Sequence, residues 1–193
     1  MHVISHFVSM RRYDLSKTRL IFLSIFFICS LLFSNSSNAG RIGANIVLRS
    51  NVTIELNKLL LSSDNLRIAL LSQDEDQIEI CLRELSWEVD QARAVSVYVR
   101  DFDRRHLLKI LDNIKTNLDM SFSSYGVYRK DFFIKAFNQF ANIVRIYQVD
   151  ARFSIFYCPK DHATWVQSTT KAENPFRSST VPKDCGLRVN RQN

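Results

Sequence analysis

The chain has 193 residues and a formal net charge of +7 at pH 7. Its hydrophobic content of 46% and charged content of 23% are typical of a globular protein, and this length favours a single domain. It contains only four glycines and three prolines, which argues against a turn-rich all-β fold and against a disordered chain.

The first 39 residues have the pattern of a secretory signal peptide. A basic leader precedes "LIFLSIFFICSLLF", residues 20–33, which carry no charge. This run is shorter than the roughly 20 residues that a bilayer-spanning helix needs. Small residues follow, and we predict cleavage between Ala39 and Gly40, so that the mature protein is exported, either to a periplasm or to the extracellular space. Met10 as the true start and an uncleaved membrane anchor are the alternatives. The basic residues of the leader are Arg11, Arg12, Lys17 and Arg19.

Much of the positive charge belongs to this leader. Removing its four basic residues and one acidic residue from the totals of 26 and 19 leaves 22 basic and 18 acidic residues, a net charge of +4. Such a weak excess favours solubility and does not indicate a nucleic-acid partner. The basic stretch Arg100–Lys109 is diluted by Asp101 and Asp103, and we interpret it as the solvated start of a helix.

From Asn51 to about Val149 the apolar residues recur every three or four positions, which predicts helices. The first helix begins near Asn51, and Ser63 or Asp64 could interrupt it by capping a new start. The second begins at residues 74–76, three acids that the helix macrodipole favours at an N-terminus. Its predicted apolar face comprises Ile78, Cys81, Leu82, Leu85, Val89, Ala92 and Val99.

Two more helices are predicted before Asp150. Asp101 or Asp103 could cap the third, and Gly126 could end it as a left-handed C-terminal cap. The fourth runs from about Tyr128 to Tyr147. Four such segments with short connections predict a mainly α fold built on an antiparallel four-helix bundle. The predicted core residues of these two helices are Leu107, Leu111, Ile114, Leu118, Phe133, Ala136, Phe137, Phe140, Val144 and Tyr147.

At Asp150 the apolar pattern changes to period two. "ARFSIFYC", residues 151–158, predicts a strand, "CPKDHA" a turn, and "TWVQS" a returning strand. A single hairpin is marginally stable alone, so we expect it to pack on the bundle with Trp165 buried. Residues 168–184 are polar and irregular and have little apolar material to hold them in place.

Three cysteines remain after removal of the leader: Cys81, Cys158 and Cys185. Export places them in an oxidising compartment, where disulfides persist. A Cys158–Cys185 bond would close the irregular segment, and the chain-entropy model gives roughly 3–4 kcal/mol for a loop of this length. We therefore predict a small C-terminal hairpin with a disulfide-tethered coil. Cys81 lies on an apolar helix face and suits a buried thiol; intermolecular pairing and a reactive thiol stay open.

The stretch "FYCPKDHATWVQ", residues 156–167, also suggests chemistry. Cys158 and His162 lie four apart, and Cys185 with a nearby acid could complete a zinc-type ligand set. Catalysis by Cys158 with His162 would need an orienting group and an oxyanion hole, which nothing designates. Haem bound through His106 and Met120 is a further alternative. P-loop, dinucleotide-binding, GxSxG, HExxH and CxxCH motifs are absent from the sequence, and we expect no cofactor and no enzymatic activity.

These patterns predict three regions: a removed signal peptide at 1–39, a helical bundle at 40–149, and a stapled tail packed on it at 150–193. The predicted function is that of an exported, non-catalytic binding or interaction module of the cell envelope, with a protein as its partner and with membrane contact only through the signal peptide. A metal- or haem-binding carrier that uses Cys158, His162 and Cys185 or a bundle site is the alternative. Candidate interaction anchors are Tyr157, Trp165 and Phe176.

Overall fold

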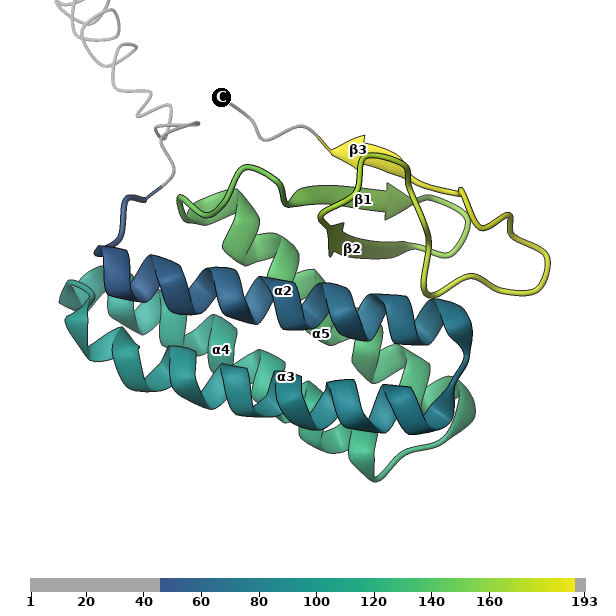
Figure 1. Cartoon of the computed structure of the whole chain (residues 1–193), viewed down its shortest axis with the longest axis horizontal. Coiled ribbons are helices and arrows are strands. Elements are labelled where there is room, and N and C mark those ends of the chain that lie inside the picture. Colours follow the sequence, from purple (N-terminus) through teal and green to yellow (C-terminus); the bar gives the residue numbers. More distant parts are fainter. Residues whose placement is uncertain (1–45, 190–193) are drawn as a thin grey trace, which may run out of the picture. The chain divides into compact units, whose positions relative to one another are not determined.

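In the computed structural model, residues 46–189 are described, and they form four long helices followed by a small sheet (Figure 1). The predicted signal peptide and its cleavage site lie outside these residues. The fold is mainly α, as predicted. The helices are α2 (Ser50–Ser72), α3 (Glu75–Val95), α4 (Asp101–Phe122) and α5 (Gly126–Ile146), with a short 3-10 turn, η1 (Ser96–Tyr98), before α4.

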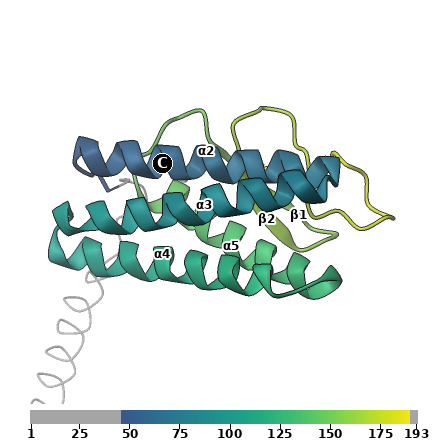
Figure 2. The same ribbon diagram turned by 60° about the horizontal axis from the view of Figure 1, so that its bottom comes forward.

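The helices form two antiparallel hairpins that pack on each other (Figures 1 and 2). Helix α2 lies beside α3, and α4 lies beside α5. Every apolar position predicted for the second, third and fourth helices is buried, because each face closes on a neighbouring helix or on the sheet. Val99, predicted on the second helix, is buried but lies beyond the end of α3 and after η1. The largest contributors from α5 are Phe133, Phe137 and Phe140.

Helix ends follow local chemistry, with three departures from expectation. The first is that Arg100, and not Asp101 or Asp103, is the N-cap residue of α4. The Asp74 side chain caps α3 by accepting a hydrogen bond from the Gln77 amide at 3.1 Å. Helix α2 is continuous through Ser63 and Asp64, because the Ser63 hydroxyl donates to the Leu60 carbonyl and Asp64 is used in a buried ion pair. Gly126 has the expected left-handed φ of 57°, but it starts α5 instead of ending α4.

Three strands follow the bundle, in the order β2-β1-β3, all antiparallel. The predicted hairpin is β1 (Ser154–Cys158) with β2 (Ala163–Gln167), and β3 (Leu187–Val189) adds to the free edge of β1. Phe156 pairs with Trp165 across the hairpin, and their rings stack with centroids 5.9 Å apart. The sequence pattern predicted one covered face, but four of the five β1 residues are buried, because the sheet packs on α5 and the tail returns across Trp165.

Glu88 of α3 is an acidic residue with a buried oxygen that is unpaired in the described part of the chain. It is 9% exposed, and its Oε2 atom is buried without a hydrogen-bond partner among residues 46–189. Burial raises the pKa of its carboxyl above the usual value, and the neighbouring Glu55 raises it further. The folded protein therefore holds a proton on Glu88 at pH values where the unfolded chain has lost it.

We predict that Glu88→Gln removes a pH-dependent loss of stability. Because the folded-state pKa is raised, wild-type stability falls as pH rises from the unfolded value near 4.5 through the folded value. The variant should match wild type near pH 4 and be more stable at pH 7, by about 1.4 kcal/mol for each unit of pKa difference. Urea unfolding from pH 4 to 8 measures this. Asp131→Asn, which removes an exposed acid of α5 that does not act on Glu88, is the control and should change the curve little; equal effects of both variants would contradict the assignment.

Candidate functional site

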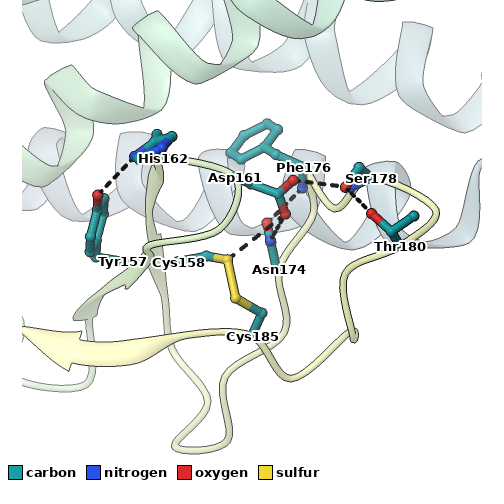
Figure 3. Close-up of a disulfide and its surroundings, with 9 residues drawn as sticks. All are labelled: Tyr157, Cys158, Asp161, His162, Asn174, Phe176, Ser178, Thr180 and Cys185. Atoms are coloured by element: carbon teal, nitrogen blue, oxygen red, sulfur yellow. Dashed lines mark hydrogen bonds between the residues drawn. A yellow bond between two sulfur atoms is a disulfide. The ribbon is translucent and has the colours of Figure 1, made fainter.

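The predicted disulfide is present and fixes the C-terminal tail. Cys158 at the end of β1 is bonded to Cys185 before β3, with a Cα–Cα distance of 5.4 Å and a separation of 27 residues (Figure 3). Cys158 is fully buried, and Cys81, the remaining cysteine of residues 46–189, is a buried free thiol. The bond ties the far end of an irregular segment to the centre of the sheet.

The acid in the turn of the hairpin anchors the tail. Asp161 accepts hydrogen bonds from the Asn174 side-chain amide at 2.8 Å and from the Ser178 backbone amide at 3.2 Å (Figure 3). Asn174 is fully buried, and its side-chain oxygen accepts from the Phe176 amide at 2.9 Å. Asp161 and Asn174 therefore set the path of residues 174–178.

Two of the three predicted metal ligands at this turn, Cys158 and Cys185, are joined in the disulfide. Both sulfurs are in the disulfide, and the His162 Nδ1 lies 3.3 Å from the Tyr157 hydroxyl. Within residues 46–189, no three His, Cys, Asp or Glu side chains are grouped so that they could share a metal ion. His162 instead has a left-handed φ of 51°, which fits its place in the turn between β1 and β2.

The two residues considered for haem cannot serve together as axial ligands within one chain. His106 and Met120 lie on the same helix, α4, 14 positions apart, which corresponds to about 21 Å along the axis. The His106 Nδ1 lies 3.2 Å from the Tyr147 hydroxyl, and burial raises the pKa of Tyr147 to about 12. This pair belongs to the packing of α4 on α5.

A buried ion pair on α2 holds the near end of the tail. Arg67 is 1% exposed and Asp64 is 3% exposed, and the Arg67 Nε donates to Asp64 at 2.5 Å. The second Asp64 oxygen accepts from the hydroxyl of Ser168 at 2.6 Å and from its amide at 3.2 Å. Arg67 also reaches Glu173 at 3.3 Å. Helix α2 therefore fixes both sides of the turn that follows β2.

Between these anchors the tail forms one wall of a cleft at the end of the bundle. The cleft has a volume of about 610 Å³ and joins three regions: the α2–α3 turn, the start of α5, and the tail at 175–177. Its lining combines apolar and aromatic side chains with charged ones. The lining residues are Leu70, Gln73, Glu75, Ile78, Glu79, Tyr125, Gly126, Arg129, Lys130, Phe133, Pro175, Phe176 and Arg177.

The charges of the cleft are unequally paired. Arg129 forms ion pairs with Glu75, at 2.9 Å, and with Glu79, and its guanidinium lies over the Phe133 ring. Its Nε is buried and has no hydrogen-bond partner among residues 46–189. Lys130 and Arg177 form no ion pair within this part of the chain. The rim therefore keeps positive charge that the fold does not neutralise.

Two of the three candidate interaction anchors are buried, as predicted for Trp165. Trp165 is fully buried against Gly186 and Ala172, and Phe176 is 2% exposed, with its ring 5.1 Å from that of Phe137. Both stabilise the attachment of the tail, and Phe176 reaches the cleft only as part of its wall. Tyr157 is partly exposed but lies away from the cleft lining. Sequence reasoning missed Tyr125, which is 82% exposed at the cleft.

Comparison with protein-family models, with curated proteins and with solved structures gives no match. Among residues 46–189, no helix combines the length and apolar character that crossing a membrane requires. The candidate site therefore depends on its own geometry and charge.

We predict that Arg67→Met loosens the tail. It leaves the Asp64 charge buried without its partner, which typically costs about 3–5 kcal/mol of unfolding free energy. Adding Asp64→Asn should restore part of the loss, because the amide oxygen can still accept from Ser168 and no charge is left buried. Urea unfolding measures both variants.

The control for this prediction is Arg93→Met, which breaks exposed pairs with Asp90 and Asp112. Exposed pairs contribute about 0.2–1 kcal/mol, so the control should change little. An Arg67 variant as mild as this control would show that the buried pair does not hold the tail.

Proposed function

We propose that this protein is an exported, non-catalytic binding module of the cell envelope, acting in the periplasm, and that the cleft at the end of its bundle holds a partner protein. The observation that carries the proposal is the cleft itself. One of its walls is an irregular tail that a disulfide and two sets of buried polar contacts hold in place. These contacts fix the conformation of a segment that has little regular structure. A surface with a fixed conformation loses less entropy when it binds a partner, which favours a role in recognition.

Export is supported by two independent features. Residues 1–39 carry the basic leader, the uncharged run and the small residues of a signal peptide. The Cys158–Cys185 bond suits an oxidising compartment, since cytosolic proteins keep such thiols reduced. In this proposal the mature chain begins at Gly40 and meets the membrane only during export.

The chemistry of the cleft favours binding over catalysis. Its lining holds no serine, threonine, cysteine or histidine, so the common nucleophiles and the commonest general base are missing from it. The two carboxylates, Glu75 and Glu79, are both paired with Arg129. Beside these acids the lining includes three aromatic residues and two arginines, and these residue types are enriched where proteins bind one another.

Photo-crosslinking in the native host tests the proposal. p-Benzoylphenylalanine placed at Tyr125, which is 82% exposed at the cleft, should capture one exported partner after irradiation of intact cells. The control position is Phe102, which is 77% exposed at the opposite end of α4. We expect an adduct from position 125 and none from position 102.

Two outcomes would overturn the proposal. Equal adducts from both positions, or none from position 125, would show that the cleft is not the binding surface. An adduct with a cytosolic protein would refute export.

A further inference from the structure

We propose that the cleft recognises an apolar side chain with a carboxylate beside it, presented by a peptide segment of the partner. This inference rests on the proposed function and specifies its ligand. It follows from three features of the cleft: an apolar floor, a rim with unpaired cations, and an uncapped helix N-terminus.

The floor of the cleft accepts an apolar group. Leu70, Ile78, Phe133 and Phe176 line it, and all four are at least partly buried in the protein core. A volume of about 610 Å³ lies within the roughly 300–1,000 Å³ range of ligand sites. Tyr125 also lines the cleft and is 82% exposed, so the apolar surface extends from the buried floor to the solvent at the start of α5. A peptide with more than one apolar residue could use this extended surface, whereas a single small molecule would leave it uncovered.

The cations of the rim favour an anionic group. The lining carries three cations and two acids, and both acids face Arg129. Lys130 and Arg177 can therefore pair with a negative group of a ligand, and the buried Arg129 Nε can donate a hydrogen bond. Because Glu75 and Glu79 would repel a second negative charge, the arrangement suits one carboxylate and not a polyanion.

The start of α5 adds to this preference. Gly126 lines the cleft, no side chain caps this helix, and its first turn has no acid. The neighbouring α3 is different, because Asp74 caps it and Glu75 and Asp76 occupy its first turn. Uncapped amides and the positive end of the helix dipole attract an anion. At this end of the bundle, an external carboxylate can therefore bind the uncapped backbone amides of α5.

Matched small probes test the charge preference. We would titrate the exported, disulfide-bonded protein with 3-phenylpropionate and with 3-phenylpropylamine, which share the apolar part and differ in charge, and follow backbone amides by NMR. The ligand efficiency typical of such molecules gives a dissociation constant of about 1–10 mM for the acid. The amine should bind about tenfold more weakly, because attraction to Lys130 and Arg177 becomes repulsion. Amides of Gly126 and Arg129 should shift.

Variants locate the effect. Lys130→Gln with Arg177→Gln should weaken the acid about fivefold, whereas Lys109→Gln with Lys183→Gln, which removes two exposed charges outside the cleft lining, should not. Equal binding of acid and amine, or shifts confined to other surfaces, would overturn the proposal.

Two larger probes distinguish the source of the carboxylate. The peptide acetyl-Leu-Phe-Glu-amide should bind more tightly than phenylpropionate, because it covers the surface beside Tyr125. If decanoate binds and the peptide does not, the ligand is a small acid and the peptide part is wrong. If no probe binds but position 125 still crosslinks to a partner, the proposed ligand chemistry is wrong and the binding function stands. Failure of both experiments would refute the binding function as well.

Discussion

Residues 168–186 pack few apolar side chains, so covalent and polar contacts decide their position. Phe176 and Val181 are the large apolar side chains of this segment that are buried. The Cys158–Cys185 bond limits the freedom of the unfolded loop, and Asp161 and Asp64 then hold two points along it. Each of these contacts connects the tail to a rigid element, the sheet or α2. The cleft depends on all of them, because its outer wall is residues 175–177.

The helical bundle supplies the other walls of the cleft. Antiparallel hairpins bring the α2–α3 turn and the start of α5 to the same end of the bundle, although they are about 50 residues apart in the chain. The Phe137–Phe176 contact closes the tail onto α5 beside the cleft. Arg129 then crosses from α5 to Glu75 and Glu79 of α3. Packing, disulfide and ion pairs thus combine to shape a single concave surface.

The sequence was sufficient for features that are repetitive or covalent. Helical periodicity identified the buried faces of α3, α4 and α5, and two cysteines that bracket a polar segment identified the disulfide. It was insufficient for the cleft, because the lining comes from three distant segments whose meeting depends on tertiary packing. The predicted burial of Trp165 is confirmed, and this burial leaves it no exposed surface with which to act as the interaction anchor that its aromatic character suggested. Asp64 was considered only as a possible helix cap, and its ion pair with Arg67 beside the returning tail was not predicted.

The third strand illustrates the same limit. Residues 187–189 were too short to predict as a strand, yet the disulfide at Cys185 places them next to β1, where they pair. A helix cap was likewise expected at Gly126 from its conformational freedom, but its position between α4 and α5 made it the first residue of the next helix. The left-handed conformation of Gly126 was predicted correctly, but in both cases contacts outside the segment decided which element it joined.

The thiol state of the protein taken from its native host tests the central claim most directly. The protein would be denatured in acid, alkylated before and after reduction, and mapped by peptide mass spectrometry. We expect a peptide linking Cys158 to Cys185, with Cys81 alkylated without reduction and the mature chain starting at Gly40. Finding Cys158 and Cys185 both alkylated before reduction would contradict the claim, because the tail would then lack the bond that holds the cleft wall in place.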